Sequence, residues 1–119
     1  MRISFLGTGT SQGIPVIACN CLVCNSSDTR NQRLRSSVWI ETDHQSILID
    51  IGPDFRQQAL RHGITRVDAI LVTHEHADHT AGMDDIRPIN FSMNQKIPLY
   101  AEEHTLLDLK KRFYYIFGP

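Results

Sequence analysis

Residues 73–79 read Thr-His-Glu-His-Ala-Asp-His, and they follow an apolar run that begins at Val67. Three of the six histidines of the chain and one aspartate therefore fall within one short segment. Packing of a hydrophobic strand gives no reason for such a cluster, whereas a site for two metal ions requires several neutral imidazoles and a carboxylate in one small volume. The stretch predicts a metal centre in the loop after a strand. A surface turn that carries chance histidines is the alternative.

The spacing within this motif predicts how its side chains divide between metal ions. In an extended segment His74 and His76 point the same way, because side chains alternate with a period of two, so both can bind one ion. Asp78 and His79 follow where the chain turns into a helix, and they project toward a second ion. Imidazole and carboxylate ligands together suit Zn²⁺, Mn²⁺ or iron. Two such ions roughly 3.5–4 Å apart can share a water molecule and deprotonate it.

Asp50 ends a second apolar run, Ile47–Ile49, and is a further candidate for the site. Two interpretations of this aspartate stay open on the sequence alone. In the first, its side chain caps the helix that is expected to start near Pro53. In the second, its carboxylate orients a metal-bound histidine or a water molecule from behind the ligands, as carboxylates commonly do in metal centres.

Composition limits the class of protein and its partners. The chain has 119 residues, of which 41% are hydrophobic and 21% charged, which is ordinary for one small soluble domain. The formal net charge of −1 provides no basic field for phosphates, so nucleic acid is not an expected partner. No apolar run approaches the roughly 20 residues that span a membrane, and the apolar part of residues 1–7 is too short for a secretory signal. We therefore expect a cytoplasmic protein without a membrane partner.

Hydrophobic periodicity and turn residues predict an α/β domain, a mixed sheet with flanking helices. Residues 15–31 have no clean period and are expected to be irregular, and residues 80–89 to form a loop and a short helix that is cut at Pro88. The segment over residues 67–73 is apolar at nearly every position, which predicts a central strand buried on both faces. Strands are expected over residues 2–6, 36–42, 46–51, 67–73 and 97–101, and helices over residues 54–62 and 102–113.

Three cysteines lie close together in the irregular segment, as Cys19-Asn-Cys21-Leu-Val-Cys24. In a reducing compartment such clustering favours metal binding over a disulfide. Three thiolates within one loop suit a structural zinc ion, although such ions usually have four ligands. The fourth ligand stays unassigned, and neither His44 nor His62 has a stronger claim. The alternative is a set of inert or partly oxidised thiols.

Several motifs together resemble those of one known family. Residues 73–79 are similar to the His-x-His-x-Asp-His signature of the metallo-β-lactamase superfamily, and Ser46-Ile-Leu-Ile-Asp-Ile-Gly52 resembles its first motif. Phe5-Leu-Gly-Thr-Gly-Thr-Ser-Gln-Gly-Ile-Pro15 resembles the opening of the ribonuclease Z-like branch. More narrowly, this opening, the three cysteines and Gly82-Met-Asp-Asp-Ile-Arg-Pro-Ile-Asn90 resemble the phosphodiesterases of the carbon–phosphorus lyase pathway, which open cyclic ribose phosphates.

The resemblance implies a fold, a site and an activity. Family members form a four-layer αβ/βα sandwich with two divalent metal ions, Zn²⁺ or Mn²⁺, at the junction of its halves. The resemblance implies that His74 and His76 bind the first ion and that Asp78 and His79 bind the second. It also implies that Asp50 supports these ligands from behind them. Asp78 and Asp50 are then the catalytic carboxylates. A hydroxide that bridges the metals would attack a small phosphate ester, so the implied protein is a metal-dependent hydrolase and chiefly a phosphodiesterase.

Two alternatives to this activity stay open at the level of the sequence. One is an RNA-processing nuclease of the same superfamily. The other is a catalytically inactive zinc-binding fragment. The resemblance implies this alternative because, in family members, a second half supplies further metal ligands of the active site. That half also supplies a histidine as the fourth ligand of the cysteine cluster. After His79 this sequence has only His104, which is expected to be an exposed residue of the last helix.

We therefore expect residues 1–119 to form the N-terminal half of a metallo-β-lactamase-fold domain. Half of a sandwich leaves one face of its sheet apolar, and soluble monomers avoid large exposed apolar patches. Either the missing C-terminal half or a second copy of the chain, as a homodimer, is expected to cover that face.

Overall fold

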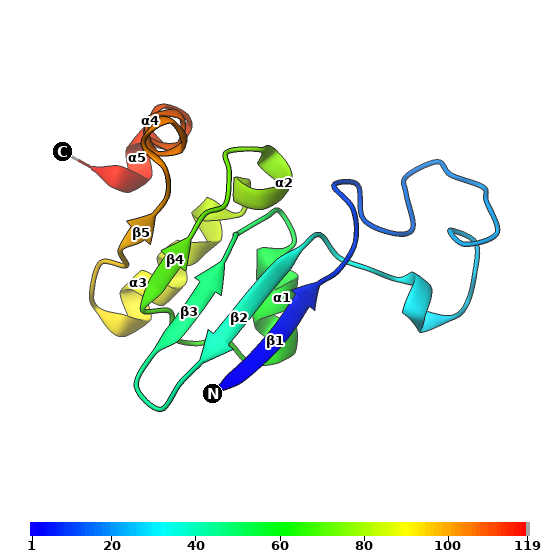
Figure 1. Cartoon of the computed structure of the whole chain (residues 1–119), viewed down its shortest axis with the longest axis horizontal. Helices are drawn as coiled ribbons and strands as arrows, with labels where there is room; N and C mark the ends of the chain where they lie inside the picture. Colours follow the sequence, from blue (N-terminus) through cyan, green and yellow to red (C-terminus); the bar gives the residue numbers. More distant parts are fainter. Residues whose placement is uncertain (119) are drawn as a thin grey trace.

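A five-stranded sheet forms the centre of the computed structural model, which describes residues 1–118 (Figure 1). The strands follow one another across the sheet in chain order, as β1 (Arg2–Gly7), β2 (Ser37–Glu41), β3 (Ser46–Ile49), β4 (Ala69–Leu71) and β5 (Leu99–Tyr100). The first three strands are antiparallel, whereas β4 lies parallel to both β3 and β5. The mixed sheet predicted from the sequence is therefore confirmed.

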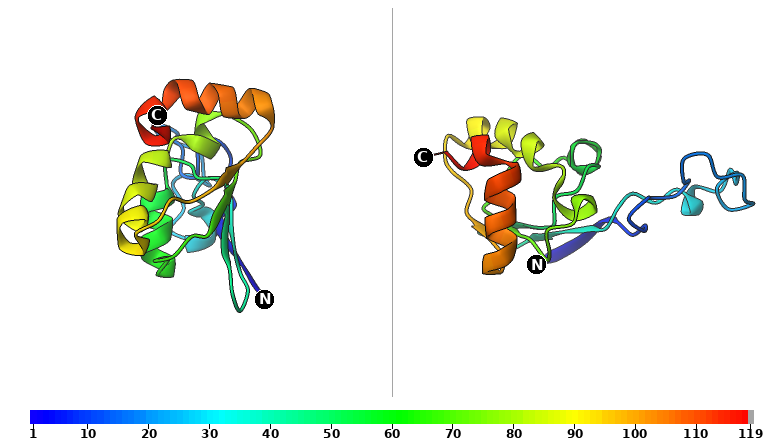
Figure 2. Two further views of the ribbon diagram at one scale, coloured as in Figure 1. Left: turned by 90° about the vertical axis from the view of Figure 1, so that its left-hand side faces the viewer. Right: turned by 90° about the horizontal axis from the view of Figure 1, so that it is seen from above.

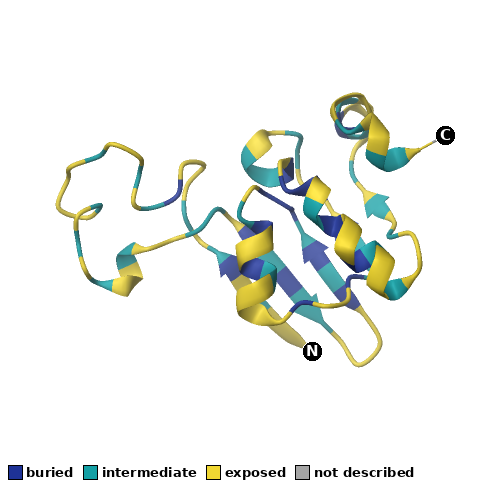
Figure 3. Ribbon diagram, turned by 180° about the vertical axis from the view of Figure 1, so that it is seen from behind, coloured by how far each residue is buried: buried dark blue, intermediate teal, exposed yellow. Residues whose placement is uncertain are grey.

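Helices cover one face of the sheet and the edge beside β5. The helices α1 (Phe55–His62) and α3 (Arg87–Met93) lie side by side against that face, as Figure 3 shows from behind. The short helix α2 (Ala77–Thr80) follows β4, and α4 (Glu103–Arg112) and α5 (Tyr114–Phe117) follow β5. Two 3-10 turns, η1 (Thr29–Asn31) and η2 (Met83–Ile86), complete the helical elements. None of the helices in residues 1–118 is long and apolar enough to span a membrane.

The hydrophobic core lies between α1, α3 and the face of the sheet that they cover. Trp39, Leu48 and Ile70 stand in register on adjacent strands and are buried there. Phe55 of α1 and Leu109 of α4 belong to the same buried cluster. Buried and half-buried residues alternate along β2 and β3, as expected for strands that are covered on one side.

The opposite face of the sheet is apolar, and α1 and α3 do not lie on it (Figure 2). Phe5, Val38, Ile49, Leu71 and Tyr100 stand in register across all five strands, so their side chains share this open face. Phe5 is 68% exposed and Tyr100 is 57% exposed. Within residues 1–118, this row of side chains has no second layer to pack against.

The strand β4 is central but is not buried on both faces. It pairs with β3 on one side and β5 on the other, which confirms its predicted central position. The predicted burial is wrong within the described residues, because Ile70 faces the helices and is buried whereas Leu71 faces the open side and is exposed. The strand is also shorter than residues 67–73, although Val67 and Val72 beside it are buried.

Pro88 does not cut a helix, contrary to the prediction. It lies in the first turn of α3, where its missing N–H breaks no helical hydrogen bond. The helix therefore continues to Met93 and ends at Asn94, whose φ of 52° lies in the left-handed region. The helices predicted over residues 54–62 and 102–113 are confirmed to within one residue at each end.

Residues 8–36 form an arm that extends away from the sheet (Figures 1 and 2). Hydrogen bonds close its base, where the N–H of Gly9 donates to the carbonyl of Leu34 at 2.7 Å and Ile14 and Arg33 exchange two bonds at 2.9 and 2.8 Å. Beyond this base, η1 is its one helical turn, so the irregular structure predicted for residues 15–31 is confirmed. The three cysteines lie in this outer part of the arm.

Candidate metal centre

The predicted histidine motif lies at the edge of the sheet where β3 and β4 end. Asp50 follows β3 directly, and its N–H donates to the carbonyl of Leu71 at 2.8 Å. The loop that carries His74 and His76 follows β4 and leads into α2. Because adjacent parallel strands end at the same edge of a sheet, the topology brings residues 50–52 against this loop.

Three side chains of the motif converge on one small volume. One ligand atom each of His74, His76 and Asp78 lies within 4.8 Å of the others. The ring centroid of His74 is 4.7 Å from that of His76 and 4.2 Å from that of His79. The Nε2 atom of His79 lies 3.0 Å from the Oδ2 atom of Asp78. Asp78 therefore lies close to the His74–His76 pair and also to His79.

Asp50 supports this cluster from the core side of the sheet edge. The residue is 4% exposed, and its carboxylate accepts the N–H of Thr73 at 2.8 Å and the hydroxyl of Thr73 at 2.7 Å. The Nδ1 atom of His79 lies 2.7 Å from the same carboxylate. The helix-capping interpretation of Asp50 is wrong, because the residue that precedes α1 is Asp54. The φ of Asp50 is 63°, a conformation that costs a non-glycine residue about 1–3 kcal/mol and is typical of functional sites.

Thr73 is a part of the site that the sequence did not identify. Its hydroxyl has one proton, which it donates to Asp50, so the contact of 2.9 Å with Nδ1 of His74 requires the proton to lie on that nitrogen. By the same reasoning, the carboxylate of Asp50 accepts a proton from Nδ1 of His79. A proton on Nδ1 directs Nε2 toward a metal ion, which is the arrangement that metal-bound histidines usually have.

Two glycines allow the backbone segments of the site to touch. A Cβ atom on Gly52 would lie 2.2 Å from the carbonyl oxygen of Asp78, and one on Gly82 would lie 2.0 Å from the carbonyl oxygen of Gly52. The N–H of Ile51 donates to the carbonyl of His79 at 2.8 Å, and the N–H of Gly82 donates to the carbonyl of Ile51 at 3.0 Å. The distance between Asp50 and its histidine is thus set by direct backbone contact.

Glu75, which lies between His74 and His76 in the sequence, faces α4. The hydroxyl of Thr105 donates to its Oε2 atom at 3.1 Å, and the imidazole of His104 lies 3.7 Å from the same atom. Its own backbone N–H and the Thr105 hydroxyl hold the pKa of Glu75 below its usual value, so this carboxylate is ionised at neutral pH. Within residues 1–118, His104 is not part of the histidine–aspartate cluster.

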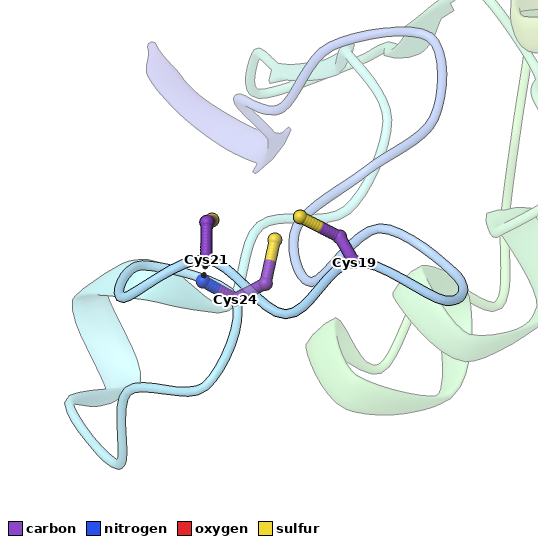
Figure 4. Close-up of side chains that lie close together, drawn as sticks. All are labelled: Cys19, Cys21 and Cys24. Atoms are coloured by element: carbon purple, nitrogen blue, oxygen red, sulfur yellow. Dashed lines mark hydrogen bonds between the residues drawn. The ribbon is translucent and has the colours of Figure 1, made fainter.

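The cysteines of the arm form a second cluster (Figure 4). The Sγ atoms of Cys19, Cys21 and Cys24 lie within 4.8 Å of one another, and no fourth ligand from residues 1–118 joins them. Hydrogen bonds from the backbone N–H of Cys24 and from the Cys19 thiol lower the pKa of Cys21 to about 7. A thiol that ionises near neutral pH is a competent metal ligand.

The donor atoms of both clusters fit divalent metal ions. Imidazole nitrogens and a carboxylate oxygen suit Zn²⁺ or Mn²⁺, and the orienting contacts of His74 and His79 are those that metal-bound histidines usually make. Thiolates suit Zn²⁺. Together, the fold and the histidine site define an α/β protein with a candidate metal centre at the carboxyl ends of β3 and β4.

The chain belongs to the beta-lactamase superfamily, because the model of the beta-lactamase superfamily domain matches residues 45–119. A diphosphatase of the PhnP family has 52% identity to the chain and superposes with a TM-score of 0.93, over 97% of this chain and 46% of that one. Zn²⁺-bound PqqB from Methylobacterium extorquens has 26% identity and a TM-score of 0.76, over 93% of this chain and 40% of that one. The resemblance to this superfamily noted from the motifs is therefore confirmed.

A third relative shows how the chain compares in length. An octanoyltransferase of Porphyromonas gingivalis is 48% identical over 118 residues, which are 98% of this chain and 24% of that protein. The chain thus spans a quarter of this relative and less than half of the two solved structures.

Proposed function

We propose that residues 1–119 form the metal-binding, N-terminal half of a metal-dependent hydrolase that acts on a small phosphate ester as a phosphodiesterase. The observation that carries the proposal is the convergence of His74, His76 and Asp78 beside His79 at the carboxyl ends of β3 and β4. The high identity to a PhnP-family diphosphatase supports a phosphoryl compound as the substrate. The net charge of −1 favours a small substrate over an RNA.

Each residue of the site has a proposed role. His74 and His76 bind a first divalent ion, and His79 a second one. Asp78, which lies close to both sets of donors, is the carboxylate ligand of the second ion and the one able to reach between them. When bound, such ions polarise a water molecule for attack and neutralise negative charge on the phosphoryl oxygens. No side-chain nucleophile is required.

The buried groups prepare the histidines for these ions. Asp50 holds the proton of His79 on Nδ1 and, through the hydroxyl of Thr73, that of His74. With these protons on Nδ1, Nε2 is the nitrogen that each imidazole offers to a metal ion. Asp50 is thus a positioning residue in this proposal.

The cysteine cluster is proposed to hold a structural zinc ion. Cys19, Cys21 and Cys24 supply three thiolates, and one further ligand would complete the usual four. A reducing compartment such as the cytoplasm keeps these thiols available for metal. The zinc ion would fix the outer part of the arm.

Hydrolysis of bis-p-nitrophenyl phosphate by the protein expressed from its complete reading frame tests the proposed function. We expect turnover with added Mn²⁺ or Zn²⁺, loss of turnover after chelation, and loss of at least about 100-fold in His76→Ala. Asp43→Asn, an exposed substitution in the turn after β2, is the matched control and is expected to retain activity. Absence of turnover in the unaltered metal-loaded protein would contradict the proposal. Cleavage of RNA in preference to the small ester would instead favour the nuclease.

A further inference from the structure

The helix α4 directs one polar face at the histidine loop. Thr105, Asp108 and Arg112 are spaced three and four residues apart, so they lie on the same side of the helix. Thr105 is 1% exposed, and the Nε atom of Arg112 lies 2.7 Å from the carboxylate of Asp108. A buried hydroxyl such as that of Thr105 normally has a hydrogen-bond partner, and the contact with Asp108 orients the guanidinium of Arg112. Both groups are therefore expected to have partners on the histidine loop that they face.

Both groups find their partners on Glu75. The hydroxyl of Thr105 donates to the side-chain Oε2 atom of Glu75 at 3.1 Å, and the Nη2 atom of Arg112 donates to the backbone carbonyl of Glu75. The same Nη2 atom lies 3.3 Å from the hydroxyl of Thr80. Thr80 in turn donates to the carbonyls of Glu75 and His76 at 3.1 and 3.0 Å. Thr105 therefore holds the side chain of Glu75, and Arg112 holds its backbone carbonyl.

Glu75 is the residue that separates His74 from His76. Rotation of its backbone would change the direction in which each of these imidazoles points, and a misplacement of about 1 Å in a site of this kind has large effects. Asp50 restrains the histidines from the core side, through Thr73. The contacts from α4 restrain the same loop at Glu75.

We propose that Arg112 and Thr105 are positioning residues of the metal centre, which act through Glu75 to fix the relative orientation of His74 and His76. This inference rests on the proposed function only in that the histidines bind a metal, not in the reaction that follows. Arg112 is expected to contribute more than Thr105, because its guanidinium holds the backbone of the loop and the hydroxyl of Thr80.

Binding of Mn²⁺ tests this role independently of hydrolysis, because thiolates disfavour this ion and the cysteine cluster does not compete. The dissociation constant and the electron paramagnetic resonance spectrum of bound Mn²⁺ are measured for the protein from its complete reading frame and for Arg112→Ala, Arg112→Lys and Lys111→Ala. We expect Arg112→Ala to weaken binding by about 10-fold or more and to alter the spectrum. Arg112→Lys is expected to recover part of the affinity, and Lys111→Ala, which changes an exposed neighbour by the same charge, to behave as the unaltered protein.

The outcomes separate positioning from simple packing. Unchanged Mn²⁺ affinity and spectrum in Arg112→Ala, with a lower melting temperature of the metal-free protein, would overturn the proposal. If that variant does not fold, Thr105→Val removes one hydrogen bond at constant shape, and unchanged binding in it would overturn the proposal equally. Mn²⁺ binding that depends on His76 without hydrolysis of any phosphate ester would contradict the proposed function alone. Absence of His76-dependent binding in the unaltered protein would contradict both.

Discussion

The histidine loop and the cysteine arm both gather candidate metal ligands, but the chain supports them in different ways. The loop is held by a buried carboxylate, by backbone contacts to residues 51 and 52 and by two side chains of α4. The sulfur atoms of the arm contact one another and the N–H groups of Val16 and Cys24. Groups from several elements of the domain therefore hold the histidine loop, whereas the cysteines are held by contacts within the arm itself. If both clusters bind metal, the arm is expected to depend more on its ion for order than the loop does.

Gly52→Ala should break the histidine loop and have the largest effect. The new Cβ atom would stand 2.2 Å from the carbonyl oxygen of Asp78, and backbone on both sides cannot rotate away. We expect a loss of at least about 3 kcal/mol in the free energy of unfolding, the upper end of what overpacking usually costs, and loss of metal binding. Denaturant unfolding and calorimetric metal titration measure these effects.

Gly63→Ala is the control for this prediction. Gly63 has a positive φ, of 67°, which Gly52 does not have, and a Cβ atom on Gly63 meets nothing within 4 Å. This substitution should cost about 1–2 kcal/mol through backbone strain alone and leave metal affinity unchanged. Equal effects of the two alanines on metal binding would show that the close approach at Gly52 is not what forms the site.

Asp50→Asn should weaken the histidine site without unfolding the sheet. The amide keeps the size of the carboxylate but cannot accept from the Thr73 N–H, the Thr73 hydroxyl and Nδ1 of His79 together. We expect a loss of roughly 10–100-fold in Mn²⁺ affinity, as is usual when an orienting carboxylate is removed. Mn²⁺ titration measures it, with the exposed Asp43→Asn as control. Unchanged affinity would contradict the role given to Asp50.

Removal of zinc should loosen the arm and leave the sheet as it is. After chelation, hydrogen–deuterium exchange over residues 15–31 is expected to become faster, because few backbone hydrogen bonds hold this segment. Exchange over β3, whose residues are paired on both sides, is expected to stay the same. The variant Cys24→Ser should give the same exchange pattern without chelation. Equal protection of the arm with and without metal would contradict the proposed zinc site.

The smallest effect concerns the reactivity of Cys21 in the metal-free protein. Its lowered pKa of about 7 means that the reactive thiolate forms as the pH rises through 7 and is lost as the pH falls below it. The alkylation rate by iodoacetamide should therefore have a midpoint near pH 7. Mass spectrometry assigns the modified residue, and Cys21→Ser removes this component. A midpoint near the ordinary thiol value of 9.0 would contradict the hydrogen bonds given to its sulfur.

The fold and the centre of the site follow from patterns that are local in the sequence. The residues of segments 36–42 and 46–51 predicted two strands, which the structure has at 37–41 and 46–49, and the density of histidines in residues 73–79 pointed to the candidate metal centre. The irregular structure of the arm followed from its lack of a period. Each of these signals lies within about ten residues, which is the range over which periodicity can be judged.

The groups that support the site could not be predicted, because they come from distant parts of the chain. Thr105 and Arg112 look like ordinary polar residues of an amphipathic helix, and their common partner Glu75 lies 30 and 37 residues away in sequence. Thr73 looks like the last residue of a strand. The prediction that Pro88 interrupts a helix was wrong for a local reason. From the sequence alone, a proline in the first turn of a helix cannot be distinguished from one that interrupts a helix, unless the start of the helix is known.

The open face of the sheet makes protein concentration an experimental variable. The apolar row from Phe5 to Tyr100 is expected to bind a fluorescent dye such as anilinonaphthalene sulfonate when nothing covers it. If a second copy covers the row, dilution should lower the melting temperature and raise the dye fluorescence, since association follows mass action. If another part of the same polypeptide covers it, both quantities should be independent of concentration. A dilution series thus distinguishes an intermolecular layer from an intramolecular one.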